Sequence, residues 1–508
     1  MPKLITQQPA GREGLLFFGK VTVVTLIAVA CIEFLSFAVF VYPAVGTVAF
    51  AVIALATFAL ALWRLEYGVY IAFAELLVGS KGYLFAIDIA GTAVSVRHAI
   101  FSAVMLAFCM HAIRMRQVCF FQLPVWEAIL LFTCCIAFGT VSGVLHGNDL
   151  YTVFLDMNGY LFLGLILPAA QSIVSKDQLK RLLQVAAGAM IALSVTTLLL
   201  LFTFAHSITA FNGTVYRWIR VTGVGEITPT HEQFYRIFFQ SHIFHLLFFF
   251  VAFAFCVATW QERRTKQVFV YGAFSALLLT IIITSWSRSF WLALVVSMVA
   301  MAIAFVSTKL WRWKDIGHAA VLTVATGAAS LIVLFLLTNV PLLGEQWKGF
   351  FFAEIVCERA SYTAEEPAIS TRMNILAPLW DVVNEHLYTG SGFGATLTYT
   401  TDDPRAIDMM GTDQYTTFAF EWGYLDLLYE LGVLGLLAYL VLFVVLFWHG
   451  ARVVRSAQTT GRKVLALSFM TGLLCLLFVH VTTPYLSHPL GIGFIILFII
   501  FVLERPRD

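Results

Sequence analysis

The sequence has little charge. Only 12% of its 508 residues are Asp, Glu, Lys or Arg, about half of the share with which a soluble domain covers its surface. Hydrophobic residues make up 60%, and the mean hydropathy is +0.88. An ordinary soluble enzyme is therefore excluded, because most of the outer surface must face lipid. The 31 Lys and Arg against 29 Asp and Glu leave a net charge of +2, which gives no concentrated basic surface for nucleic acid.

Motifs for metals and nucleotides are also missing. The sequence has no CxxC pair, no HExxH and no His/Cys cluster with metal-ligand spacing, so it predicts no metal site. It has neither GxxxxGK[ST] nor GxGxxG, so no nucleotide cofactor is expected. Seven of the eight cysteines fall in or beside apolar stretches, and only Cys357 lies in a long polar segment. A single cysteine there cannot form an internal disulfide.

Long apolar runs dominate what is present. A helix needs about 20 apolar residues to cross a bilayer, and about fourteen stretches approach this length. They are Val21–Val41, Val45–Trp63, Tyr67–Gly79, His98–Ile113, Val125–Leu145, Tyr160–Ile173, Leu182–Ala205, Phe239–Trp260, Val268–Thr284, Phe290–Val306, Ala319–Leu337, Tyr424–Trp448, Val464–His480 and Leu490–Val502. Of these stretches, Tyr67–Gly79 fits a membrane span least well. The pattern predicts an all-α integral membrane protein with about 14 transmembrane helices.

The basic residues predict how these helices are oriented. If the N-terminus is cytoplasmic, 21 of the 31 Lys and Arg fall inside, mostly in short loops, as the positive-inside rule expects. The first stretch is then a retained signal anchor, and both termini lie inside. Two longer polar segments face outward. The predicted organisation is N-terminal helices over 1–206, a smaller outer loop over 207–238, central helices over 239–340, a large outer loop domain over 341–423 and C-terminal helices over 424–508.

The large outer segment has the composition of a small water-facing domain. It carries 12 acidic and 4 basic side chains in 83 residues. Its amphipathic stretch Arg372–His386 predicts a helix. The glycine-rich run Gly390–Gly394 that follows predicts a tight loop in which glycine permits close backbone approach.

Arginines on the outer side oppose the charge bias and are candidates for function. Arg217 and Arg220 are three residues apart, Arg236 lies at the start of an apolar stretch, and Arg288 stands in SWSRSF between two apolar stretches. If a helix begins at Ser289, Arg288 and the free amides of its first turn make one positive site suited to phosphate. Alternatively, such arginines reach lipid headgroups or pair with loop carboxylates.

Glu421 is the acidic residue that we single out. It closes the large outer segment just before a long helix, with Asp426 and Glu430 further along. A carboxylate at the water-to-lipid boundary, between Phe420 and Trp422, is a candidate general base. Its alternative role is to stabilise the N-terminus of that helix.

Together these segments resemble the O-antigen ligase and polymerase superfamily of bacterial envelope glycosyltransferases. The resemblance covers roughly residues 217–437. SWSRSF is similar to the family's Ser-Arg turn, and STRMNILAPLWDVVNEHLYTGSGFG is similar to its Arg…Trp…Pro-Leu-x-Gly-x-Gly-x-Gly stretch. GYLDLLYELGVLGLLAYL is similar to its Tyr-Leu helix, and RVTGVG to the Arg-x-x-Gly of its smaller outer loop.

The resemblance implies a metal-independent, inverting transfer of a glycan from an undecaprenyl diphosphate carrier, on the periplasmic face of the bacterial inner membrane. Arg220 and Arg288 would stabilise the diphosphate leaving group, and Arg217, Arg236, Arg372 and His386 would bind substrate. The ligases have a histidine just before the Tyr-Leu helix, where this sequence has Glu421. This implies a glutamate base, a different acceptor, or an alignment that shifts the role to His386.

We therefore favour a polymerase of exopolysaccharide or O-antigen repeat units over a ligase that delivers glycan to lipid A core. The expected partners are the lipid-linked glycan donor, a glycan or lipid A core acceptor, membrane lipids and other polysaccharide assembly or export proteins. A transporter or flippase of lipid-linked oligosaccharide is the alternative from another class. It would place its charges deep in the membrane and show repeat symmetry.

Overall fold

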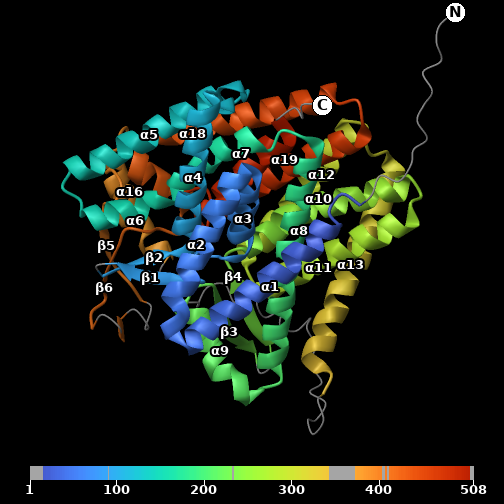
Figure 1. Cartoon of the computed structure of the whole chain (residues 1–508), viewed down its shortest axis with the longest axis horizontal. Helices are drawn as coiled ribbons and strands as arrows, with labels where there is room; N and C mark the ends of the chain where they lie inside the picture. The colour runs from blue at the N-terminus through green and yellow to red at the C-terminus, as the bar shows by residue number, and fades with distance from the viewer. Residues whose placement is uncertain are drawn as a thin grey trace, which may run out of the picture.

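The computed structural model describes residues 15–89, 91–231, 234–341, 372–402, 407–408 and 411–503. Twelve helical segments of this part are long and apolar enough to cross a membrane (Figure 1). They are α1 (Lys20–Val41), η1 with α2 (Pro43–Trp63), α4 (Val96–Met115), α5 (Trp126–Leu145), α6 to α7 (Leu150–Ser172), α8 (Lys176–Ala205), α10 (His242–Gln261), α11 (Thr265–Thr284), α12 (Arg288–Ser307), α13 (Trp313–Asn339), α18 (Gly423–Ser456) and α19 (Thr460–His480). The chain is an integral membrane protein built mainly of α-helices.

These twelve segments coincide with twelve of the fourteen predicted stretches. The other two are shorter: Tyr67–Gly79 is α3 (Leu65–Val78), and Leu490–Val502 is α20 (Pro489–Phe498) followed by the π-helical turn η4 (Ile499–Leu503). Both are almost entirely buried by protein. An apolar run therefore does not by itself distinguish a membrane span from a short helix inside the bundle.

In the part of the chain that the structure describes, three short antiparallel ladders connect the helices, and hydropathy did not predict them. β1 (Ala86–Ile89) pairs with β2 (Thr92–Ser95), β3 (Gly225–His231) with β4 (Phe234–Phe239), and β5 (Leu397–Thr400) with β6 (Gln414–Thr417). Each is a two-stranded ladder between helical segments. The segment 207–238 thus contains β3 and β4 after the short helix α9 (Thr209–Val221).

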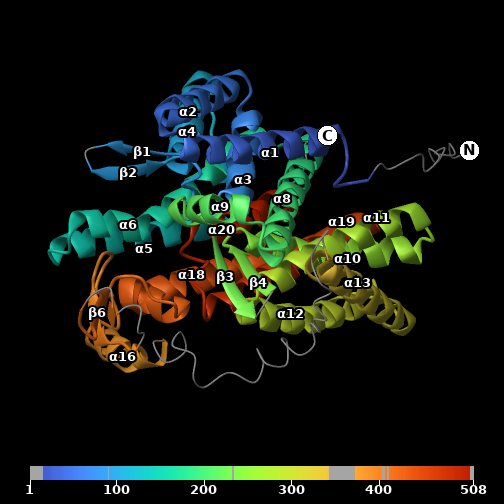
Figure 2. The same ribbon diagram turned by 90° about the horizontal axis from the view of Figure 1, so that it is seen from below.

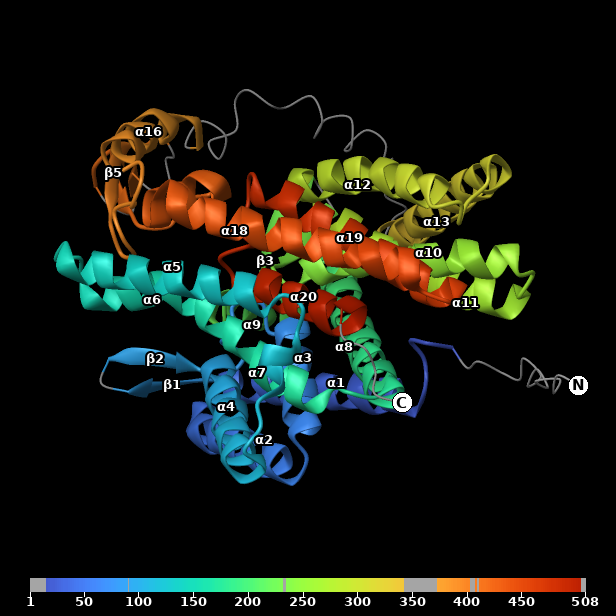
Figure 3. The same cartoon turned by 90° about the horizontal axis from the view of Figure 1, so that it is seen from above.

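The two ends of the bundle differ. Figures 2 and 3 place the turn between α10 and α11 at one end, beside the first described residues. At the other end lie α6, α16 (Leu376–Glu385) and the β5–β6 ladder, of which Figure 2 labels β6 and Figure 3 labels β5. We call these the α11 end and the α16 end. The segment 342–371, including Cys357, lies outside the described residues.

The centre of the bundle is α10. Its most apolar window is 83% buried, whereas that of α2 is only 17% buried and faces outward. α10 packs against α11 and α19, and α19 in turn packs against α12 and α18. Because α10 is apolar on every side, it forms the core against which the more lipid-facing helices are arranged.

A small lobe with its own core lies on the first turns of α18. The α16 lobe, residues 372–402 and 411–422, buries Leu379, Val383, Leu397 and Phe420 together with Tyr429 of α18. The predicted amphipathic helix is present as α16, and its apolar face supplies two of these residues. The lobe therefore joins the membrane bundle through an apolar contact with α18.

The glycine-rich run after α16 anchors the lobe. Gly390, Gly392 and Gly394 all have positive φ, as the prediction of a tight loop requires. A Cβ at Gly392 would lie 2.2 Å from the backbone nitrogen of Gly143 in α5, and one at Gly394 would lie 2.6 Å from that of Val153 in α6. The loop passes so close to two helices that only glycine fits.

The same loop provides hydrogen-bond partners for the backbone groups at a break in α18. Gly432 has φ 64° and interrupts the helix, which frees backbone groups inside an apolar segment. The carbonyls of Tyr429 and Glu430 accept hydrogen bonds from the amides of Ser391 and Gly392, at 2.7 and 3.1 Å. The amide of Val433 donates to the Leu387 carbonyl at 2.8 Å. A broken membrane helix requires partners of this kind.

Gly392→Ala is expected to loosen the α16 lobe. The new methyl group meets backbone atoms of α5 that cannot rotate away, so the added cost is about 1–3 kcal/mol beyond the backbone strain at positive φ. Gly411→Ala is the matched control, because Gly411 also has positive φ but has open space around its Cβ. Limited proteolysis should cut the lobe faster in Gly392→Ala than in Gly411→Ala. Equal cutting rates would show that close packing does not hold the lobe.

Candidate active site

The β3–β4 hairpin presents Arg236 to the turn between α11 and α12. Arg236 Nε donates to the Ser285 carbonyl oxygen at 3.1 Å, and Nη1 lies 3.5 Å from Glu226 Oε2. The guanidinium carbon lies 4.8 Å from the centre of the Phe238 ring. Alternate residues of β4 share a face, so Arg236 and Phe238 point to the same side while Ile237 is buried behind them. Three contacts thus fix this half-buried guanidinium.

The α11–α12 turn is rigid. Trp286 has φ 53°, which is strained for a bulky residue, and its buried ring packs 5.0 Å from the rings of Phe234 and Trp291. Ser287 caps α12, and the helix begins at Arg288, one residue before the predicted Ser289. Arg288 is half-buried at this N-terminus. The turn therefore combines an arginine with the positive end of a 20-residue helix, an arrangement that favours an anion.

A cavity of about 90 Å³ lies beside this turn. It is lined by Phe238, Gln240, Thr483, Pro484, Tyr485 and His488. Tyr485 donates its hydroxyl to the Gln240 carbonyl at 3.0 Å, and its ring lies 6.1 Å from that of Phe290 in α12. The cavity lies between the end of β4 and the 481–488 loop before α20. At about 90 Å³ it is smaller than the roughly 300–1,000 Å³ of ligand pockets, so it does not by itself make a substrate site.

Two further cations lie near this cavity. Arg97 of α4 forms a buried ion pair with Glu75 of α3 at 2.8 Å. Burial, together with the positive charges of Arg97 and Lys81, lowers the pKa of His488 to about 3. His488 is therefore neutral at physiological pH. No sequence pattern marks Arg97, Lys81 or His488, because their relation to Arg236 depends on packing between distant segments.

The α16 lobe holds a second pair of candidate residues. Arg372 Nε donates to Glu421 Oε2, and the Trp422 indole donates to the Arg372 carbonyl oxygen at 2.8 Å. The Glu421 side chain is 58% exposed, so Phe420 and Trp422 do not bury it. The structure thus brings together two predicted residues that are 49 positions apart. The ion pair also gives Arg372 a structural role within the lobe.

The remaining predicted residues lie outside these contacts. Arg217 and Arg220 are exposed on α9, which buries Trp218 and Ile219 instead. His386 is exposed at the C-terminus of α16, with its ring 6.1 Å from that of His146 after α5. None of the three lines either of the two described cavities. Their assignment to substrate remains a prediction.

The first residue of α18 connects the two parts of the site. A Cβ on Gly423 would lie 2.3 Å from the His480 carbonyl oxygen and 2.5 Å from its ring. Gly423 is two residues after Glu421, and His480 is the last residue before the 481–488 loop. The end of the lobe and the loop that lines the small cavity are therefore in direct backbone contact.

Arg236→Lys is expected to lower the free energy of unfolding by about 1–2 kcal/mol, because one ammonium cannot hold a carbonyl, a carboxylate and a ring together. Reversible unfolding in mixed micelles measures this. Arg217→Lys, a change of an exposed residue on α9, should stay within about 0.5 kcal/mol of the wild type. Equal effects of both changes would mean that the three contacts of Arg236 do not stabilise the turn.

Because His488 is buried and neutral, we expect the folded protein to lose stability on acidification. The unfolded chain binds a proton near the ordinary histidine pKa of about 6.5, whereas the folded chain resists it down to about 3. The resulting stability is present above pH 6.5 and falls by up to about 1.4 kcal/mol per unit as the pH drops below it. His488→Asn keeps an acceptor for the Leu490 amide and should flatten the dependence of thermal unfolding between pH 7.5 and 5. Parallel curves would contradict this role.

The family comparison concerns the second half of the chain. Residues 273–440 match the family model described as O-Antigen ligase, whereas a search of curated proteins finds no match. The matched segment is about a third of the chain and contains Arg288, Arg372 and Glu421. Proteins of this family are membrane glycosyltransferase-like enzymes. This match over about a third of the chain supports an O-antigen ligase- or polymerase-like assignment for residues 273–440.

Proposed function

We propose that the protein polymerises undecaprenyl diphosphate-linked oligosaccharide repeat units at the periplasmic face of the bacterial inner membrane. The reaction is a metal-independent, inverting glycosyl transfer. The growing or incoming glycan carries the acceptor hydroxyl, and the lipid diphosphate leaves. The α16 end of the bundle is the periplasmic end in this proposal.

One observation carries the proposal. Arg236 from β4 is bonded to the backbone of the turn that also places Arg288 at the start of α12. Two arginines about fifty residues apart, of which Arg288 lies in the matched segment and Arg236 lies before it, therefore belong to one structural unit. Fixed cations of this kind stabilise the charge that develops on a departing diphosphate.

The roles follow from position. Arg288 and the first turn of α12 face the leaving diphosphate, and Arg236 orients the turn and contributes its charge. Arg220 and Arg217, exposed on α9, bind the carrier or glycan from the flank. The acceptor hydroxyl requires a base within hydrogen-bond reach. Glu421 is that base, oriented through its Oε2 by Arg372, and His386 is the second candidate.

A ligase that transfers the glycan to lipid A core is the second candidate function. It is favoured by the description of the matched family, O-Antigen ligase. The two functions differ in the acceptor, so the α16 lobe would determine which acceptor binds. A transporter or flippase would have to move the lipid-linked glycan across the bilayer without a change in its length.

The test uses the purified full-length protein in liposomes with the undecaprenyl diphosphate-linked repeat unit of the source organism and no added metal or nucleotide. Wild type should give a ladder of longer products on a gel. Arg288→Ala and Glu421→Gln should each reduce the rate by at least about a hundredfold, the scale for loss of one charge-stabilising or acid–base group. Arg114→Gln, a change of an exposed residue at the end of α4, is the control and should retain the ladder.

The other outcomes separate the alternatives. Transfer to an added lipid A core acceptor without a ladder would establish the ligase. Loss of activity in His386→Asn but not in Glu421→Gln would assign the base to His386. Inactivity in both assays, with lipid-linked glycan crossing the bilayer, would establish transport.

A further inference from the structure

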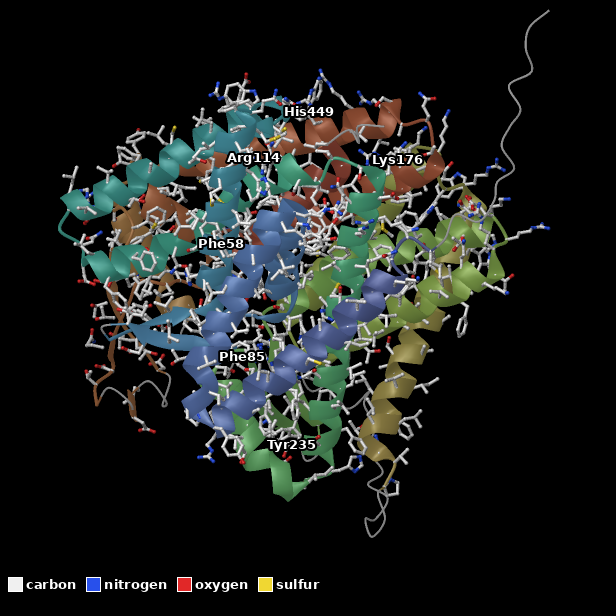
Figure 4. The ribbon with its side chains drawn as sticks, in the orientation of Figure 1. Phe58, Phe85, Arg114, Lys176, Tyr235 and His449 are labelled. Carbon is white, nitrogen blue, oxygen red and sulfur yellow. The ribbon has the colours of Figure 1, made fainter. Side chains whose placement is uncertain are left out.

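A large cavity opens at the α11 end, away from the candidate active site. Its volume is about 1180 Å³. Figure 4 labels Lys176 of α8 and His449 of α18, which both line it, on one side of the molecule, and Tyr235 of β4 on the opposite side. The cavity is therefore separate from the pocket beside Arg236, and the proposed transfer reaction does not use it.

Basic side chains dominate the charged lining of this cavity. Five lysines and arginines line it: Lys176, Lys180, Arg264, Arg452 and Arg462. The lining contains two acidic residues, Asp177 and Glu262, and Glu262 pairs with Arg264 at 2.8 Å. An excess of three positive charges remains. A cavity of this charge attracts an anion.

Local structure directs these cations into the cavity. Lys176 and Lys180 are four residues apart and share one face of α8, while Arg181 on another face lies 3.7 Å from Glu66. The guanidinium of Arg452 lies 5.0 Å from the centre of the Trp448 ring. Arg462 donates to the carbonyls of Phe501 and Val502 at 2.7 and 2.9 Å, so it is fixed at the wall.

Three helix N-termini reach the same cavity. α8 begins at Lys176, α11 at Thr265 and α19 at Thr460, and residues of each first turn line the cavity. Each N-terminus carries a partial positive charge. α10 and α18 end at the cavity, and their carbonyls offset part of this charge. The partial positive charge that remains adds to the charge of the basic side chains. The excess of basic side chains makes the cavity positive.

The rest of the lining is apolar. Leu179, Leu183, Phe255 and Phe501 are among the residues that form it. A cavity with a cationic part and an apolar wall, between membrane helices, matches a lipid with a phosphate headgroup rather than a small soluble anion. Basic pockets between membrane helices are known to bind anionic lipid headgroups, and arginine holds phosphate oxygens in a bidentate way.

We propose that this cavity binds the phosphate headgroup of an anionic membrane phospholipid, with the beginning of an acyl chain along its apolar wall. The bound lipid bridges α8, α11, α18 and α19 at the α11 end. It thereby stabilises the bundle from the side opposite the candidate active site. The proposal does not depend on the proposed function, because its readout is lipid binding and thermal stability.

The test titrates phosphatidylglycerol into the full-length protein in neutral detergent micelles and follows thermal unfolding. The unfolding temperature of the wild type should rise and saturate with phosphatidylglycerol and not with phosphatidylcholine. The double variant Lys180→Gln/Arg452→Gln should bind with an apparent affinity at least about tenfold lower, because two cations that contact the phosphate are removed.

The control removes two charges outside the cavity. Arg114→Gln/Lys314→Gln changes two exposed residues of α4 and α13 that do not line it, and it should keep the wild-type response. An equal loss in both double variants would show a general surface charge effect and overturn the site. Equal stabilisation by inorganic phosphate alone would assign the cavity to a soluble anion and overturn the lipid. No difference between phosphatidylglycerol and phosphatidylcholine would overturn the proposal altogether.

Discussion

The break in α18 at Gly432 is the constraint on which the arrangement of the α16 end depends. Backbone groups exposed by a broken helix cannot be left without partners in an apolar environment. The 387–392 loop supplies those partners and can reach them only because Gly390 and Gly392 adopt positive φ against the backbone of α18 and α5. The interrupted helix and the glycine loop therefore require one another. Together they place the first turns of α18, and with them Glu421, against the end of α19.

The same physical logic governs the charges of the candidate active site. A cation inside a membrane bundle is stable only when polar atoms surround it. Arg97 is paired with Glu75, and Arg236 is held by a carbonyl, a carboxylate and a ring. These contacts orient the positive charge and hold it near a small cavity. His488, buried among cations, stays neutral and adds no further charge. The positive charge near this turn therefore comes from arginine and lysine, and these contacts hold the guanidinium groups in one arrangement.

The candidate active site and the large cavity use positive charge differently. In the candidate active site, guanidinium groups are tied to a tight turn and a β-hairpin. At the α11 end, lysines and arginines line a wide cavity with an apolar wall. The bias of basic residues toward short loops predicted that the α11 end carries most of them. That several helix N-termini and basic residues gather around one cavity there follows only from the packing of α8, α11, α18 and α19.

The sequence by itself determined the class of the protein and the local elements. Its apolar runs predicted the twelve long helices, its amphipathic stretch predicted α16, and its glycines predicted the tight loop, because each of these depends on neighbouring residues. It also singled out Arg236, Arg288, Arg372 and Glu421 as candidates. Only the tertiary structure decided which of them meet. Arg372 with Glu421, and Arg236 with Ser285, are pairs of distant residues, and Arg97, Lys81 and His488 gain their relation to the site through packing. A hydropathy profile follows the chain and contains no information on packing. It therefore could not separate the buried α3 and α20 from membrane spans, nor show that Arg217 and Arg220 face outward on α9.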